Sequence, residues 1–173
     1  YASFSPEAGR VAKRFFDERW IDAPVRPNKR GGAFCAYTVP SGHPYVMLNF
    51  TARRRDVLTM AHELGHGLHA ALAQPQGGFH QATPLTLAET AAGFGEMLTF
   101  RALLETAQDP RERKAMLAQQ VEDRINTVMR QNAFSGSARR RHLDRRPGRL
   151  PPARLGPLRP QGTGDGPGGA VRP

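Results

Sequence analysis

The order of apolar and polar positions predicts a mainly helical chain with one small β-hairpin. Residues 5–7 (SPE) are typical of a helix start, with serine at the N-cap and proline in the first turn, and this helix is expected to run to about Arg19. Two short apolar runs, 31–39 (GGAFCAYTV) and 45–50 (YVMLNF), are joined by the turn-forming stretch PSGHP. These runs predict the two strands of the hairpin.

Three further helices are predicted after the hairpin. One spans roughly 53–73, a second begins at Thr86 and runs to about 107, and a third is capped by Asp109-Pro110 and runs to about 131. Along the third helix, four apolar residues recur at spacings of four, four and three: Leu117, Val121, Ile125 and Val128. That spacing is typical of a helix face that packs into a core.

A change in composition predicts a folded part, residues 1–134, followed by a tail, residues 135–173. From 139 to 173 the chain holds nine Arg, seven Pro and seven Gly. Such a segment buries too little apolar surface to offset the entropy lost on ordering, so the tail is predicted to be disordered. Codons for Arg, Pro and Gly are rich in G and C, and we hypothesise that the tail is a frameshift product.

The net charge of +10 suggests a nucleic-acid partner, but most of this charge lies in the tail. Residues 139–173 have a balance of +7, which leaves only +3 on the rest of the chain. No stretch is apolar and long enough for a membrane span or a signal peptide. The single cysteine, Cys35, excludes an internal disulfide and fits a reducing compartment, so we expect a cytoplasmic protein. Because the chain begins at Tyr1, we expect it to be a fragment of a longer protein.

The segment His62-Glu63-Leu64-Gly65-His66 matches the H-E-x-x-H pattern on a predicted helix. Residues four apart share one helix face, about 5–6 Å apart at Cβ, so the two imidazoles can bind one zinc ion. Glu63 lies beside the metal and can act as general base toward a zinc-activated water. The alternative is that both histidines lie on a partly buried helix and bind no metal. The pattern arises rarely by chance, which favours the metal.

A catalytic zinc needs a third protein ligand and an open fourth position. Glu89 and Glu96 follow His66 by 23 and 30 residues, and their spacing of seven places both on one helix face. One of them can bind the metal while the other supports a histidine. Glu89 has a second interpretation, because TLAE at 86–89 is also a capping box. For Glu96 the alternative is a solvated helix face. Spacing favours Glu89 as the ligand.

The chain resembles the oligoendopeptidase F branch of the thimet oligopeptidase family of zinc metallopeptidases. The resemblance covers about residues 1–134 and depends on three stretches in order: KRGGAFCAYTVPSGHPYVMLNF, RRDVLTMAHELGHGLH and TPLTLAETAAGFGEMLTFRALL. It implies part of a largely helical catalytic domain, with a small sheet beside the zinc helix. It also implies hydrolysis of short peptides with one zinc ion per chain.

The resemblance further implies roles for individual residues. His62, His66 and Glu89 correspond to zinc ligands, Glu63 to the catalytic base, and Glu96 to a residue supporting a ligand. The strand that begins Gly31-Gly32-Ala33-Phe34 resembles the edge along which substrate backbone lies. Glycines there would allow close approach of a peptide, although an ordinary hairpin start explains them equally well.

The chain also departs from the family pattern. Family members are several times longer, and they carry Tyr and His residues downstream that bind substrate and stabilise the oxyanion. After VMRQNAF this chain leaves the pattern, and no tyrosine follows Tyr45. Loss of one oxyanion donor can reduce turnover by roughly 10²–10³. Two alternatives to a zinc endopeptidase therefore stay open: a non-catalytic zinc-binding remnant, and an anionic-polymer binder that uses the Arg-rich tail.

Overall fold

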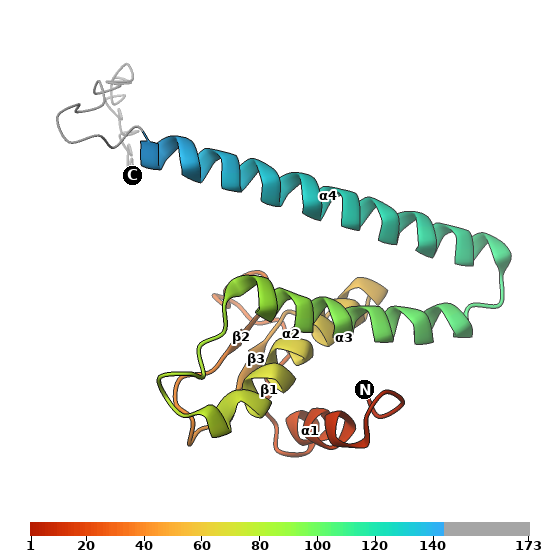
Figure 1. Ribbon diagram of the computed structural model, residues 1–173. Coiled ribbons are helices and arrows are strands. Elements are labelled where there is room, and N and C mark those ends of the chain that lie inside the picture. The colour runs from red at the N-terminus through yellow and green to blue at the C-terminus, as the bar shows by residue number, and fades with distance from the viewer. Residues whose placement is uncertain (144–173) are drawn as a thin grey trace, which may run out of the picture. The chain divides into compact units, whose positions relative to one another are not determined.

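The computed structural model describes residues 1–143, and side-chain environments through residue 137 (Figure 1). The chain divides into two compact units, Tyr1–Gln120 and a second that begins at Val121. Its elements in order are α1 (Pro6–Asp17), β1 (Ile21–Asp22), β2 (Phe34–Ala36), β3 (Tyr45–Met47), α2 (Arg54–Ala73), the 3-10 turn η1 (Gln74–Gln76), α3 (Leu85–Thr106) and α4 (Pro110–Leu143). The predicted mainly helical architecture with a small sheet is confirmed.

The ends of the helices follow local sequence signals. Ser5 caps α1, where its hydroxyl accepts a hydrogen bond from the Ala8 N–H at 3.3 Å. Asp56 lies in the first turn of α2, where its Oδ2 accepts hydrogen bonds from the Thr51 N–H and hydroxyl, both at 2.7 Å. Before α4, the Asp109 carboxylate accepts from the Arg111 N–H at 2.9 Å. The bonds from the Ala8 and Arg111 N–H groups satisfy helix donors that have no partner within the helix, and those to Asp56 tie the preceding residue Thr51 to the start of α2.

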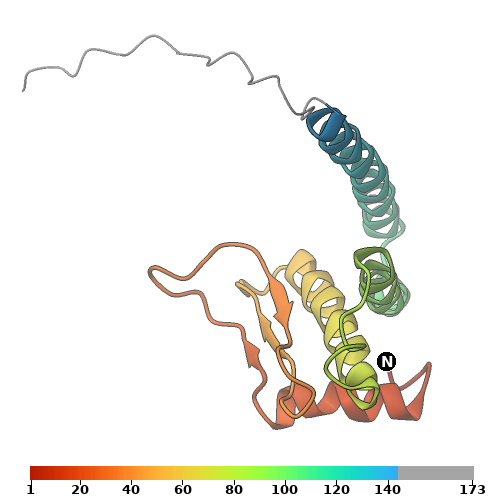
Figure 2. The same ribbon diagram turned by 60° about the vertical axis from the view of Figure 1, so that its left-hand side comes forward.

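The sheet has three strands in the order β1-β3-β2. The predicted hairpin is present: β2 and β3 are antiparallel, with Cys35 opposite Val46. Sequence analysis missed β1, a two-residue strand that pairs in parallel with β3 through Ile21 and Val46. Strand β2 lies at one edge of the sheet, beside α2 (Figure 2). The edge strand is therefore next to the helix that carries H-E-x-x-H.

The core forms where α1, the sheet and α2 meet. Its buried members are Phe15, Trp20, Val46, Leu48 and Leu64. The Phe15 and Trp20 rings pack edge to face, with centroids 5.0 Å apart. Leu64 is the first of the two variable positions in H-E-x-x-H, so the motif itself anchors α2 in the core.

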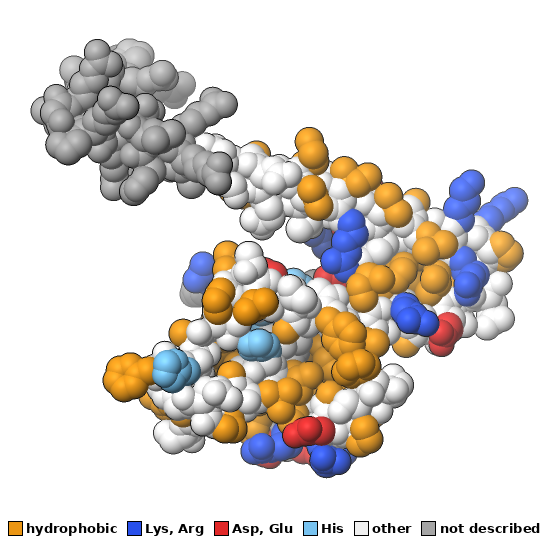
Figure 3. Space-filling model, viewed as in Figure 1, with side chains coloured by type: hydrophobic (Ala, Val, Ile, Leu, Met, Phe, Trp, Pro, Cys, Tyr) orange, Lys and Arg blue, Asp and Glu red, His pale blue; other side chains and the backbone are white. Residues whose placement is uncertain are grey.

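Two predictions about the C-terminal helix are wrong. The proposed core face is exposed in the structure, with exposed fractions of 46–59% at Leu117, Val121, Ile125 and Val128. Figure 3 shows hydrophobic side chains at the surface along α4. Spacing alone identifies an apolar stripe but not whether another element covers it. The helix also continues beyond residue 131 to Leu143, so residues 135–143, assigned to the disordered tail, are helical. The rest of that tail, 144–173, lies outside the described residues.

None of the helices in the described part of the chain combines the length and the apolar character needed to cross a bilayer. The longest, α4, has 34 residues, but charged side chains recur along it. This finding agrees with the hydropathy of the sequence.

Candidate metal centre

His62 and His66 lie one turn apart on α2 and face the same way. Their ring centroids are 5.0 Å apart, and the ring planes are nearly perpendicular, at 86°. The side chains are 30% and 17% exposed, so both are shielded but reachable from solvent. The helical spacing thus brings the two imidazoles together as expected.

Glu89 approaches the same two rings from α3. Its Oε2 lies 3.4 Å from His62 Nε2, and its Oε1 lies 3.7 Å from His66 Nε2. One ligand atom from each of the three residues lies within 4.8 Å of the others. Two imidazole nitrogens and one carboxylate oxygen form a donor set that suits a zinc ion with an open fourth position. The chemistry of the residues present therefore fits a metal.

The capping-box interpretation of Glu89 is wrong in this structure. Helix α3 begins at Leu85 with Pro84 at the N-cap, and no side chain caps it. Thr86 therefore lies inside the first turn, where its carbonyl accepts a hydrogen bond from the Thr90 hydroxyl at 2.8 Å. The N-cap, Pro84, lies two residues before Thr86, the N-cap that a capping box would require. Glu89 therefore does not bond back to the helix end, and its carboxylate faces α2.

Glu96 lies on the other side of the His62 ring. Its Oε2 is 3.3 Å from His62 Nδ1, the nitrogen opposite the one that faces Glu89. A hydrogen bond at Nδ1 leaves the lone pair on Nε2, as a metal ligand requires. This contact raises the pKa of His62, and it is the largest cause of that shift. The spacing of seven residues between Glu89 and Glu96 brings both carboxylates to one histidine.

Glu63 is the most buried carboxylate of the site, at 7% exposure. Burial raises its pKa, and a hydrogen bond from the backbone N–H of Cys35 on β2 acts in the opposite direction. For His66, burial lowers the pKa. A buried carboxylate beside two imidazoles is suited to take up and release a proton.

Cys35 is not an activated nucleophile. Burial, with a contribution from the charge of Glu63, raises the pKa of its thiol to about 12. A thiol with so high a pKa stays protonated near neutral pH and reacts slowly.

A cleft of about 400 Å³ opens onto the histidines and connects them to the edge strand. Besides the histidines, Glu63 and Glu89, it is lined from the sheet side by Ala33, Phe34, Cys35 and Tyr37, and from the α3 side by Thr83, Leu85 and Ala88. Two of the four predicted substrate-binding residues, Ala33 and Phe34, are thus in the cleft wall, whereas Gly31 and Gly32 are not among its lining residues. A Cβ at either glycine would meet open space.

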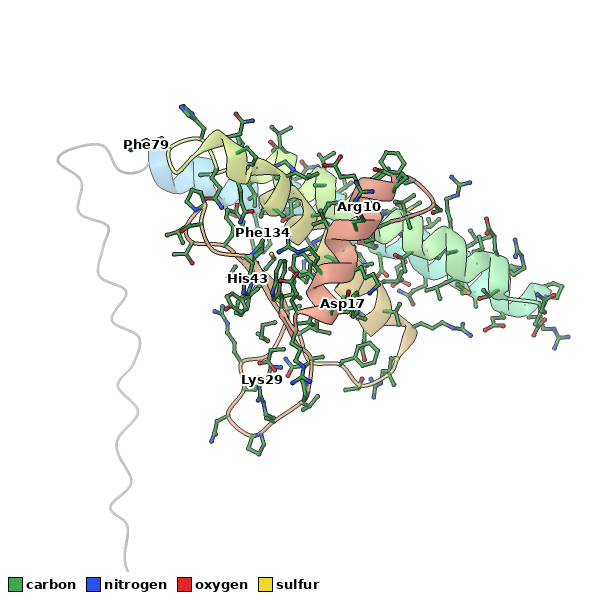
Figure 4. The ribbon with its side chains drawn as sticks, turned by 90° about the horizontal axis from the view of Figure 1, so that it is seen from below. Arg10, Asp17, Lys29, His43, Phe79 and Phe134 are labelled. Atoms are coloured by element: carbon green, nitrogen blue, oxygen red, sulfur yellow. The ribbon has the colours of Figure 1, made fainter. Side chains whose placement is uncertain are left out.

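The loop before β2 is held by two side chains that sequence analysis missed. Lys29, labelled in Figure 4, donates from Nζ to the carbonyls of Asp22, Pro24 and Leu48 at 2.8–2.9 Å. Asn49 donates to the carbonyls of Arg30 and Gly32 at 2.9 and 3.1 Å. These bonds fix the course of the chain into the cleft wall.

Gln120 is a further residue near the site that sequence analysis missed. It lies on α4, is 8% exposed, and donates to Glu96 Oε1 at 3.4 Å. No sequence signal marked it, because a glutamine on a polar helix is ordinarily solvated. Only the packing of Gln120 near Glu96 distinguishes it from its neighbours.

Comparison with known proteins identifies relatives for most of the chain. Residues 6–147 match the family model of peptidase family M3. The chain is 31% identical over 135 residues to the chromosomal oligoendopeptidase F of Lactococcus lactis subsp. cremoris, covering 78% of this chain and 22% of that protein. It is 34% identical over 120 residues to an oligoendopeptidase F homolog of Borreliella burgdorferi, covering 68% of this chain and 20% of that protein.

Solved structures show the same fold. A crystal structure from Chlamydophila abortus, described as a peptidase, matches with a TM-score of 0.69 and 30% identity, over 79% of this chain and 23% of that one. PZ peptidase A matches with a TM-score of 0.54 and 22% identity, over 58% of this chain and 18% of that one. The chain thus spans about a fifth of the length of these relatives.

Proposed function

Because the chain belongs to peptidase family M3, we propose that its metal centre serves zinc-dependent hydrolysis of short peptides. The observation that carries this proposal is the convergence of His62, His66 and Glu89, whose ligand atoms lie within 4.8 Å of one another. These three residues would hold one zinc ion. When bound, zinc acts as a Lewis acid that lowers the pKa of a water and polarises the scissile carbonyl.

Glu63 would act as the general base in this proposal. Its buried carboxylate lies beside the histidines and would take a proton from the attacking water, then deliver it to the leaving amine. The raised pKa of Glu63 favours that exchange, since a carboxylate with too low a pKa is a weak base. The N–H of Cys35 would hold the carboxylate in place between the two transfers.

Glu96 would orient the zinc ligand His62. By accepting a hydrogen bond from Nδ1, it would keep the Nε2 lone pair directed toward the metal. Glu96 would therefore contribute to zinc affinity without touching the ion or the substrate.

The edge strand β2 would receive the substrate backbone. Ala33 and Phe34 line the cleft, and an extended peptide laid along an exposed edge can pair as an added strand. Gly31 and Gly32 come just before this stretch, and a Cβ at either would meet open space, so their backbone would be accessible to an approaching peptide.

The test combines metal analysis with peptide cleavage. Purified wild-type protein is expected to hold one zinc per chain and to cleave a quenched fluorescent peptide, with activity lost on chelation. Glu63→Gln is expected to keep the zinc and lose the cleavage, because it removes the base but no ligand. A folded wild-type protein that binds no zinc would overturn the proposal.

The same measurements distinguish an active zinc peptidase from the alternative, a non-catalytic zinc-binding remnant. The remnant would be supported if the protein binds one zinc per chain but neither wild type nor Glu63→Gln cleaves any peptide tested. Removal of residues 139–173 tests the anionic-polymer alternative, since salt-sensitive polyanion binding should disappear with the tail.

A further inference from the structure

We propose that Gln120 is a positioning residue of the metal centre, acting on His62 through Glu96. The inference rests on the proposed function, because it assumes that His62 binds zinc. It assigns to α4 a part in metal binding that neither the H-E-x-x-H motif nor the glutamates of α3 reveal.

A continuous chain of polar contacts leads from Gln120 to the ligand atoms. Gln120 Nε2 donates to Glu96 Oε1 at 3.4 Å, and Glu96 Oε2 lies 3.3 Å from His62 Nδ1. The other nitrogen of the same ring, Nε2, faces Glu89 at 3.4 Å. Each oxygen of Glu96 therefore has its own partner, and the two partners lie on different helices.

The surroundings of Gln120 explain why this amide is held in one place. It is 8% exposed, and its Nε2 also lies 3.5 Å from Met97 Sδ on α3. A buried amide must find hydrogen-bond partners, because leaving one unpaired is costly. The strongest acceptor among its described contacts is the charged carboxylate of Glu96, and a charge-assisted bond is stronger than one to sulfur.

The chemistry of an amide suits this role. A carboxylate rotates easily about its last torsion, so a bond to one of its oxygens defines its plane less well than bonds to both. A donor on the second oxygen fixes that plane while leaving Glu96 ionised, and therefore able to accept from Nδ1–H. A carboxylate in place of the amide would repel Glu96, and an apolar side chain would leave Oε1 without this donor.

The test measures zinc affinity in Gln120→Met, which keeps the side-chain length but removes the N–H donor. Gln131→Met, at an exposed glutamine of the same helix, is the matched control. Outer-shell partners of metal ligands typically contribute 10–100-fold in affinity. We expect Gln120→Met to weaken zinc binding roughly tenfold, in competition with a chromophoric chelator, and Gln131→Met to leave it within about twofold.

A second readout distinguishes positioning from general stabilisation. Cobalt(II) bound in place of zinc reports ligand geometry through its visible absorption, and we expect Gln120→Met to alter that spectrum while Gln131→Met does not. A purely structural role would lower the melting temperature of the metal-free protein and leave both zinc affinity and the cobalt spectrum unchanged. That result would overturn the inference.

Should Gln120→Met fail to fold, Gln120→Glu provides the second test. It is nearly the same size and replaces the donor by an acceptor, so zinc binding should again weaken. Wild-type affinity in this variant would also count against the inference. Failure of wild type itself to bind zinc would overturn the proposed function, whereas tight wild-type binding with unaffected Gln120 variants would overturn the positioning role alone.

Discussion

Gly65 on α2 lies directly against the backbone of Ala92 on α3. A Cβ at Gly65 would stand 2.7 Å from the Ala92 Cα and 2.6 Å from the Ala91 carbonyl oxygen, closer than atoms can approach. Ala92 is fully buried at this contact. The second variable position of H-E-x-x-H is thus where the two helices cross, and this approach brings Glu89 to the histidines.

We predict that Gly65→Ala weakens both the fold and the metal site. The added methyl forces α3 away from α2, and overpacking of this kind costs about 1–3 kcal/mol of unfolding free energy. Displacement of Glu89 should lower zinc affinity as well. Gly136→Ala is the control, because its Cβ meets open space on a helix and should stabilise by about 0.5–1 kcal/mol. Urea unfolding and zinc titration of both variants check the prediction, which fails if Gly65→Ala behaves as wild type.

The two glutamates of α3 should differ in their effect on zinc. We expect Glu96→Gln to weaken zinc binding by about 10–100-fold, since it removes the carboxylate that supports His62 but no zinc ligand. Glu89→Gln should weaken it further, because it removes a charged ligand oxygen. Glu105→Gln, on an exposed part of the same helix, should have no effect. Competition with a chelator ranks the zinc affinities of the three variants. If Glu96→Gln weakened zinc binding more than Glu89→Gln, the proposed roles of the two glutamates would be exchanged.

Lys29 should stabilise the loop that leads into the cleft wall. Its side chain is 8% exposed, and its ammonium donates to three carbonyls and lies 3.2 Å from the Asp22 carboxylate. Lys29→Met removes these contacts, although the Asp22 carbonyl keeps its hydrogen bond from the Leu48 N–H. We expect a loss of roughly 1–3 kcal/mol in unfolding free energy and faster proteolysis within 24–32. Lys13→Met breaks only an exposed pair with Asp17, with the lysine side chain 71% exposed, and should cost less than about 1 kcal/mol. Equal effects of the two variants would contradict the prediction.

Asp56 should make the stability of the fold depend on acid pH. Hydrogen bonds from the Thr51 hydroxyl and N–H lower its pKa, so the ionised form is favoured in the folded state. A carboxyl whose pKa is lower in the folded state stabilises the fold at pH values above its unfolded-state pKa, about 3.9. This stabilisation is lost as the pH falls through the folded-state pKa. Asp56→Asn should therefore be less stable than wild type at pH 7, with the difference shrinking below about pH 4. A difference independent of pH would show that the charge is not responsible.

Much of the fold could be predicted from sequence because helix and strand signals are local. The Ser5 and Asp109 caps and the two apolar runs act over a few residues, so the predicted helices and hairpin agree with the structure. The two-residue strand β1 has too short a pattern to recognise. The stripe at Leu117 to Val128 was periodic, but periodicity cannot say whether a partner covers it.

The sequence by itself determined that two imidazoles share one helix face, because a spacing of four residues produces that geometry in any α-helix. It also placed two carboxylates on one face of the next helix. Only the tertiary structure decided which carboxylate faces the Nε2 atoms, since the close crossing at Gly65 and the start of α3 at Leu85 are contacts between distant segments. Gln120 and Lys29 gained their partners in the same way, because burial beside a distant polar group leaves no mark on the local pattern.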